Sequence, residues 1–196
     1  MKHLAPILAV LILLGGCELF APREAEPPLD TTDPYAWIPP TAPEIVLDNL
    51  KNSFPAGKTN YFLDVLKHDQ GLTPDFVFVP DAGIASSQPG VFNSWGYVEE
   101  ETFITKLFES LQTGGFQRLI WDVEQISPLG DTYEIIADYH LVLSYSDGAT
   151  QLPAQLGGQA TLTIIQNNDL LYEISRWEDL NADTLSCWTE LKAQVQ

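Results

Sequence analysis

The segment from Tyr133 to Trp177 restricts the fold most strongly, because it contains most of the chain's alternation between apolar and polar residues. In its first run, YEIIADYHLVLSY, the odd-numbered positions are all apolar or aromatic, whereas Asp138 and His140 fall between them. A period of two is typical of a strand with one buried face and one wetter face. We therefore expect the centre of an antiparallel sheet in this segment.

Turn residues divide the second half of the chain into four strands. Gly114-Gly115 ends a preceding helix, and Asp147-Gly148 and Asn167-Asn168 are typical of hairpin turns. The expected strands are residues 116–126, 132–146, 155–166 and 170–178.

Apolar residues at helical spacing predict three helices before this sheet. The first begins with a capping box at Thr41–Glu44, the second ends near Gly71, and the third occupies residues 97–111 with a glutamate-rich first turn. Between the last two helices, residues 76–79 are expected to form a short strand or extended segment, and residues 81–94 a loop.

The order of these elements resembles the nuclear-transport-factor-2-like fold, which includes the SnoaL-like polyketide cyclases and the ketosteroid isomerases. The resemblance extends over residues 41–196, and it also rests on Trp95 before the third helix and on the run ISRWED at residues 174–179. It implies an α+β domain in which a cone-shaped, curved antiparallel sheet packs on about three N-terminal helices. The same features look like those of small bacterial lipoproteins of this superfamily that have no assigned activity.

The N-terminus has the layout of a secretory signal. The run MKHLAPILAVLILLGGC contains a basic start, a short apolar stretch and small residues before Cys17. Its last four residues, LGGC, resemble the lipobox of bacterial lipoproteins, which implies that residues 1–16 are removed as a signal peptide and that Cys17 is acylated. The alternative is an ordinary secretion signal followed by a chance cysteine. Acyl chains on Cys17 would anchor the protein to membrane lipid.

Residues 17–40 are predicted to be the lipidated cysteine and a flexible tether, since Pro, Asp, Glu, Thr and Ala dominate the segment after Cys17. The aromatic stretch Tyr35–Ile38 is expected either to dock on the domain or to touch the membrane. Glu18 takes the place at which the inner-membrane retention signal of bacterial lipoproteins has Asp, so delivery to the outer membrane is favoured if the source is Gram-negative. We therefore expect an exported protein of the cell envelope.

The charge of the chain weighs against one class of partner, and its cysteine content weighs against an internal disulfide. The formal net charge is −18, and the nine Lys and Arg are spread along the chain, which weighs against nucleic acid as a partner because phosphate binding needs a clustered basic surface. With Cys17 acylated, Cys187 has no partner for an intramolecular disulfide. We expect Cys187 to be a small buried hydrophobe and not a nucleophile.

Five aromatic residues are candidates for the lining of a ligand pocket, namely Trp95, Trp121, Tyr133, Tyr139 and Trp177. The alternative is that they only pack in the core and at its rim. The enzymes of the resembling superfamily use an Asp or His base with a Tyr or Asp oxyanion partner. No such base matches by motif here, and Asp138 and His140 lie opposite the apolar face of their strand, so we assign no catalytic residue.

A weak calcium motif follows the last strand. Asp179, Asn181, Asp183 and Glu190 have the oxygen-ligand spacing of a calcium loop, but Thr184 replaces the glycine of its sharp turn. An Asx-type turn explains the same residues. The spacing of His and Cys indicates no zinc site, and no cofactor is predicted.

Together these features predict a lipid-anchored protein of the cell envelope that binds a small apolar ligand or an envelope protein without catalysis. The alternative is a SnoaL-like or ketosteroid-isomerase-like enzyme acting on a small apolar substrate. A homodimer through the outer face of the sheet is common in the resembling superfamily and stays open for this chain.

Overall fold

The computed structural model describes residues 34–68, 75–146, 151–182 and 184–195. Within this part of the chain, five strands form one sheet in the order β1-β5-β4-β3-β2. They are β1 (Val77–Val79), β2 (Arg118–Leu129), β3 (Thr132–Val142), β4 (Gln155–Gln166) and β5 (Tyr172–Leu180).

Strands β2 to β5 pair with their sequence neighbours in antiparallel register, which confirms the predicted series of strands. The segment predicted at residues 76–79 contains β1, which pairs in parallel with β5 so that Phe78 lies opposite Trp177. The sheet is therefore not wholly antiparallel. A strand of three residues carries too little pattern to reveal its partner or its direction.

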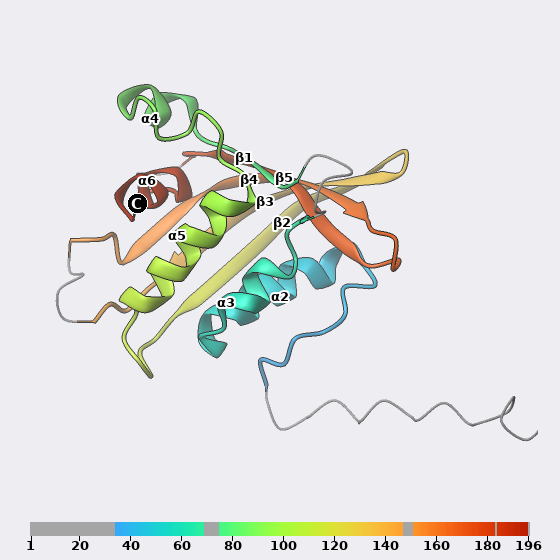
Figure 1. Ribbon diagram of the computed structural model, residues 1–196, viewed down its shortest axis with the longest axis horizontal. Coiled ribbons are helices and arrows are strands. Elements are labelled where there is room, and N and C mark those ends of the chain that lie inside the picture. The colour runs from blue at the N-terminus through green and yellow to red at the C-terminus, as the bar shows by residue number, and fades with distance from the viewer. Residues whose placement is uncertain (1–33, 69–74, 147–150, 183, 196) are drawn as a thin grey trace, which may run out of the picture. The chain divides into compact units, whose positions relative to one another are not determined.

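Five helices accompany the sheet in the described residues: α2 (Pro43–Ala56), α3 (Thr59–Leu63), α4 (Ala82–Ser87), α5 (Tyr97–Ser110) and α6 (Trp188–Gln194). Figure 1 shows α2, α3 and α5 on the same side of the sheet, with α6 beside α5. The three predicted N-terminal helices correspond to α2, α3 and α5. Helix α4 lies in the region predicted to be a loop, where Asp81 Oδ1 accepts a hydrogen bond from Ile84 N at 3.0 Å and caps this short helix.

The predicted capping box at Thr41–Glu44 is wrong. Helix α2 has Ala42 at its N-cap without a side-chain hydrogen bond, and Pro43 occupies the first turn, where a missing N–H costs nothing. The glutamate-rich start of α5 does contribute a cap, because Glu99 Oε2 accepts a hydrogen bond from Gly96 N at 3.0 Å.

The apolar face of β3 points into the core, as its alternation predicted. Ile135 and Leu141 have no exposed surface, whereas Asp138 between them is exposed. Leu50 of α2 and Ile104 of α5 are equally buried. The core therefore lies between this face of the sheet and the helices that cover it.

The segment before α2 docks on the domain. Ile38 N donates to Asn49 Oδ1 at 3.0 Å, and Asn49 Nδ2 donates to Ile38 O at 2.6 Å. Tyr172 N donates to Pro40 O at 2.8 Å, which ties the segment to the start of β5. Of the two expectations for Tyr35–Ile38, docking on the domain is confirmed.

Several predicted features lie outside the described residues, namely the signal peptide, Cys17, most of the tether, Gly71, the Asp147-Gly148 turn and Asp183. Among the residues that are described, no helix has the length and apolar character needed to cross a membrane.

Candidate functional site

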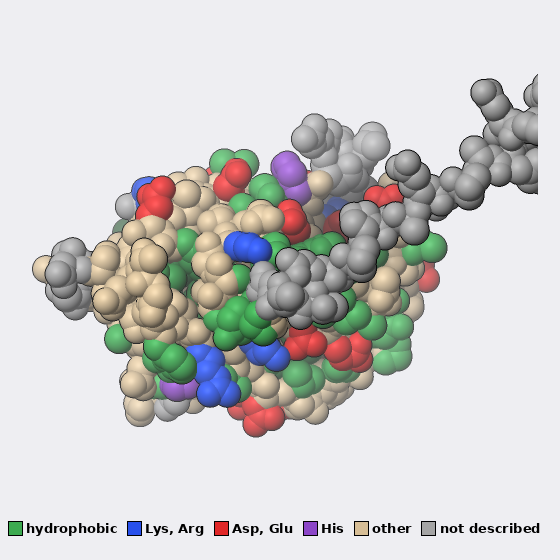
Figure 2. Space-filling view, turned by 90° about the horizontal axis from the view of Figure 1, so that it is seen from below, with side chains coloured by type: hydrophobic (Ala, Val, Ile, Leu, Met, Phe, Trp, Pro, Cys, Tyr) green, Lys and Arg blue, Asp and Glu red, His purple; other side chains and the backbone are tan. Residues whose placement is uncertain are grey.

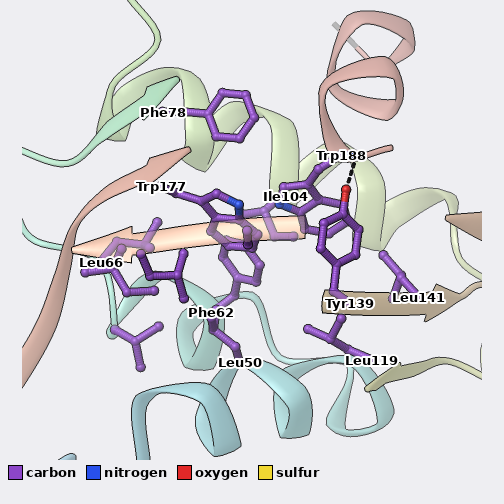
Figure 3. Packing of buried hydrophobic residues seen from close by; sticks show 14 of the residues in the cluster. Leu50, Phe62, Leu66, Phe78, Ile104, Leu119, Tyr139, Leu141, Trp177 and Trp188 are labelled. Atoms are coloured by element: carbon purple, nitrogen blue, oxygen red, sulfur yellow. Dashed lines mark hydrogen bonds between the residues drawn. The ribbon is translucent and has the colours of Figure 1, made fainter. Parts of the chain in front are cut away.

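Aromatic rings fill the space between the sheet and the helices. Trp177 of β5 and Trp188 of α6 stack with ring centroids 5.6 Å apart and an interplanar angle of 22°, and Phe62 of α3 lies against both. Figure 3 shows these rings between the strands and the helices, with Tyr139 beside Trp188. Both tryptophans are only 1% exposed. The interior of the domain is therefore packed core at this point.

A buried hydrogen-bond network lies next to these rings. Tyr139 Oη donates to Asp179 Oδ1 at 2.7 Å. It also accepts a hydrogen bond from Trp188 N at 2.8 Å (Figure 3). Asp179 Oδ2 accepts hydrogen bonds from Thr189 N and Thr189 Oγ1, both at 2.7 Å. Burial raises the pKa of Tyr139 far above its usual range, and the charge of Asp179 adds to this effect. Both carboxylate oxygens and the hydroxyl are thus engaged inside the core, as a structural network requires.

A second buried network joins α5 to α6. Lys192 Nζ donates to both carboxylate oxygens of Glu100, and Trp95 Nε1 donates to Glu100 Oε2 at 2.7 Å. The rings of Phe103 and Phe78 lie 4.3 Å and 4.4 Å from the ammonium nitrogen, within cation–π range. Burial lowers the pKa of Lys192, and the Glu100 carboxylate opposes that shift. The network holds the C-terminal helix on the rest of the domain.

The thiol of Cys187 lies at the N-cap of α6 with no exposed surface. Burial, together with the nearby Asp179 charge, raises the pKa of Cys187 to about 12. Such a thiol is neither ionised nor accessible at neutral pH, so the prediction of a small buried hydrophobe is confirmed.

An open groove with a volume of about 810 Å³ lies between α2 and β2. Leu47, Lys51 and Pro55 recur at intervals of four residues on α2 and line the groove from one helix face. Trp121 and Val123 line it from the helix side of β2. Small-molecule sites usually have volumes of roughly 300–1,000 Å³, so the groove has the size of a ligand site.

The rim of the groove carries charges of both signs. Asp48 and Lys51 form an exposed ion pair at 3.0 Å, and Glu44 and Arg118 also line the groove. Tyr35, from the docked N-terminal segment, lies at the same groove. Figure 2 views the molecule from the side on which α2 and α3 lie, and hydrophobic side chains gather there among acidic and basic ones.

The structure does not bring the five predicted pocket residues into one cavity. Trp121 lines the groove, and its ring centroid lies 5.9 Å from that of Tyr139 and 5.8 Å from that of Trp177, which pack beneath it in the core. Trp95 packs in the core near α5. Tyr133 lies elsewhere on the sheet, against Tyr172 at a centroid distance of 5.7 Å.

The residues of the predicted calcium motif are dispersed in the structure. Asp179 is 2% exposed and is engaged in the core network, whereas Asn181 and Glu190 line a small surface pocket of about 260 Å³. Asp183 lies outside the described residues. Where the chain is described, no group of three or more His, Cys, Asp or Glu side chains is placed to hold a metal ion.

The sequence did not reveal the two buried polar networks. Glu100 was interpreted only as an acidic residue in the first turn of a helix, and its partner Lys192 lies 92 positions later. Asp179 was interpreted as a loop residue, although Tyr139 reaches it from a strand 40 positions earlier. A charged residue does not reveal in the sequence which distant residue it pairs with, because only the fold brings the two together.

Comparison with known proteins gives a structural likeness only. No family model matches the chain, and no curated protein matches it in sequence. A solved protein from Novosphingobium aromaticivorans, provisionally named an aromatic ring hydroxylase, matches with a TM-score of 0.53 at 16% identity, over 79% of this chain and 96% of that chain.

Two further solved structures carry the family in their names. A nuclear-transport-factor-2-like superfamily protein from Salmonella enterica matches with a TM-score of 0.50 at 14% identity, over 71% of this chain and 88% of that chain. A protein of the same family from Streptomyces avermitilis, provisionally named a dehydratase, matches with a TM-score of 0.50 at 10% identity, over 72% of this chain and 94% of that chain. At these identities the likeness concerns the fold and not the activity. The chain has the nuclear-transport-factor-2-like fold, as its order of elements predicted.

Proposed function

We propose that this chain is a lipid-anchored protein of the cell envelope that binds a small apolar ligand in the groove between α2 and β2 and catalyses no reaction. The proposal rests on the contrast between the packed interior of the domain and the open groove beside it. The interior is packed with Trp177, Trp188 and Phe62, whereas the groove is open and has a volume of about 810 Å³. The space for a ligand is therefore in the groove between α2 and β2.

The buried carboxylates already form hydrogen bonds or an ion pair. This favours binding over the alternative of a SnoaL-like or ketosteroid-isomerase-like enzyme. A general base must reach the proton that it abstracts, with an oxygen or nitrogen free to accept it. Both oxygens of Asp179 accept hydrogen bonds inside the core, and Glu100 is paired with Lys192. The acidic groups that line the groove, Glu44 and Asp48, lie on α2, where Asp48 is already paired with Lys51.

The proposed anchor is consistent with the place at which the N-terminal segment reaches the domain. Ile38 and Pro40 are held by Asn49 and Tyr172, and Tyr35 lines the groove. An acylated Cys17 would keep the domain within a tether's length of the membrane, which contains apolar molecules.

The ligand site is tested with residues 33–196, which form a separate compact unit that contains the whole described core. We expect N-phenyl-1-naphthylamine, a neutral apolar fluorophore, to bind with increased emission. Val123→Asp places a charge in the groove and should weaken binding at least about tenfold, since an unpaired carboxylate opposes apolar contact. Leu129→Asp is the matched control, because Leu129 is 55% exposed on the same strand and does not line the groove. Equal binding by both variants, or no binding by the parent, would reject the site.

The anchor is tested by intact-mass analysis and membrane fractionation of the full chain expressed in a bacterium. Loss of residues 1–16 with a lipid-sized gain in mass, both abolished by Cys17→Ser, is the expected result. An unlipidated soluble product from the native sequence would contradict the anchor and leave the groove to be tested on its own.

A further inference from the structure

The free edge of the sheet is the backbone of β2. In the described part of the chain, β2 is the last strand of the sheet and pairs only with β3. Four consecutive residues of β2, from Arg118 to Trp121, all line the groove. Successive side chains of a strand point to opposite faces, so an unbroken run can line one groove only where the strand presents its backbone edge. Unpaired N–H and C=O groups of such an edge are a template for another strand.

The outer face of this edge carries two charges that have no partner among the described residues. Leu119 is 2% exposed and faces the helices, so Arg118, Ile120 and Asp122 lie on the opposite face, and all three are exposed. Among the described residues, neither Arg118 nor Asp122 forms an ion pair or a side-chain hydrogen bond. This arrangement leaves a cation and an anion four residues apart on either side of an exposed isoleucine.

The pairing of β2 with β3 places a second negative charge next to Asp122, so a cation there would be stabilising. Asp122 lies directly opposite Asp138 in the antiparallel register, and both side chains are exposed. Like charges in directly opposite positions destabilise a sheet. Gln159 Nε2 donates to Asp138 Oδ1 at 3.2 Å, but no cation of this chain reaches Asp122 in the described residues.

We propose that a second copy of this chain pairs with β2, edge to edge and antiparallel, about a two-fold axis through Ile120. In this register Arg118 of each copy lies opposite Asp122 of the other, and the two Ile120 side chains meet at the axis. The partner's Arg118 then faces the Asp122–Asp138 pair and relieves its repulsion. The irregularity between Val123 and Gln125 limits the paired segment to the residues before it.

This dimer differs from a dimer through the outer face of the sheet, and it does not depend on the ligand proposed above. The surface is self-complementary, as an interface with two-fold symmetry requires. In this dimer the partner's β2 lies along the β2 edge that lines the groove. The grooves of the two copies would therefore lie next to each other. Anchoring both copies to one membrane raises their effective concentration and favours even a short interface.

Disulfide trapping in the full-length protein tests the proposal. Residues directly opposite in antiparallel strands have Cα atoms roughly 4.5–5.5 Å apart, within the range that a disulfide spans. Ile120→Cys should therefore form a disulfide-linked dimer when extracts of bacteria that express the full chain are treated with copper phenanthroline, seen on a non-reducing gel. The parent chain, which contains Cys17 and Cys187, sets the background.

His140→Cys is the matched control for geometry. His140 lies opposite Ile120 on β3, one strand inside the edge, so its two copies would be about three strand spacings, or roughly 14 Å, apart in the edge dimer. No disulfide is expected there. A dimer trapped by His140→Cys as efficiently as by Ile120→Cys would indicate pairing through the outer face and overturn the proposal.

A charge exchange tests the register. In the Ile120→Cys background, Arg118→Asp or Asp122→Arg alone should lower the yield of linked dimer about tenfold, because attractive cross-strand pairs become repulsive. The two substitutions together restore opposite charges and should restore the yield. Absence of a dimer with Ile120→Cys, or no restoration in the double exchange, would overturn the proposal. All of these residues are exposed, and equal thermal melting of the variants checks that each one folds.

Discussion

Lys192 Nζ donates to both carboxylate oxygens of Glu100, and neither side chain has any exposed surface. The pair joins the C-terminal helix α6 to α5, inside a ring of aromatic side chains that includes Phe78 and Phe103. Removal of two charges from water is costly, so the pair is stable only because each charge is compensated by the other. The loss of one partner is therefore more damaging than the loss of both.

Lys192→Met should lower the free energy of unfolding by roughly 3–5 kcal/mol, because it leaves the Glu100 carboxylate buried without a cation. Lys106→Met is the control, since Lys106 is exposed on α5, and its effect should stay within about 0.5 kcal/mol. The double variant Glu100→Leu, Lys192→Met should recover most of the loss. Urea unfolding of all three measures this order. A Lys192→Met variant as stable as Lys106→Met would show that the pair is not needed.

Tyr139→Phe should cost about 1–3 kcal/mol of unfolding free energy, because it leaves Asp179 Oδ1 and Trp188 N unsatisfied in the core. Tyr145→Phe offers a comparison, since the Tyr145 hydroxyl makes one hydrogen bond, to Pro153 O at 3.0 Å, and is only partly buried. Its loss should be smaller. The same chemical denaturation compares the two variants, and an equal or larger loss for Tyr145→Phe would contradict the assigned role of the network.

The stability of the fold should decrease as the pH rises above about 9. The pKa of Cys187 is raised from 9.0 to about 12 in the folded chain. Between these values the unfolded chain releases the thiol proton while the folded chain keeps it, so the folded state binds more protons and the free energy of unfolding falls with pH. The contribution is complete below pH 9 and is lost as the pH approaches 12. Tyr139, whose pKa is also raised by burial, acts in the same direction at higher pH.

Urea midpoints at pH 7, 9 and 10.5 measure this decrease. Cys187→Ala removes the thiol and should give a shallower decrease between pH 9 and 10.5 than the parent chain. The same slope in both proteins would mean that Cys187 does not contribute to the pH dependence.

Features of the fold that depend on neighbouring residues were predicted from the sequence, whereas pairings between distant residues were not. The alternation from Tyr133 to Tyr145 predicted a strand and its buried face correctly, because period and burial are local properties. The Asn167-Asn168 turn was also local: Asn167 Oδ1 accepts hydrogen bonds from Asp169 N and Leu171 N, both at 3.0 Å. The parallel pairing of β1 with β5 joins residues 77–79 to residues 176–178 and leaves no such pattern.

The candidate site was predicted less well than the fold. The aromatic residues were correctly expected to be buried or half-buried, but only Trp121 lines the groove. Whether a tryptophan faces the core or a groove depends on how far α2 lies from β2, and no residue spacing reports that distance. Gly158 is another example, since a Cβ there would come within 2.7 Å of Tyr139 Oη on the neighbouring strand. Its small size matters because of a residue that only the sheet brings near.

The most direct test of the ligand site is hydrogen–deuterium exchange of residues 33–196 with and without N-phenyl-1-naphthylamine, at a concentration where the protein is monomeric. Binding in the groove should slow exchange in residues 114–126 and along α2 and leave exchange in β5 around Trp177 unchanged. Slower exchange around Trp177 and Trp188 with no change in residues 114–126 would contradict it, because the ligand would then enter the core and not the groove.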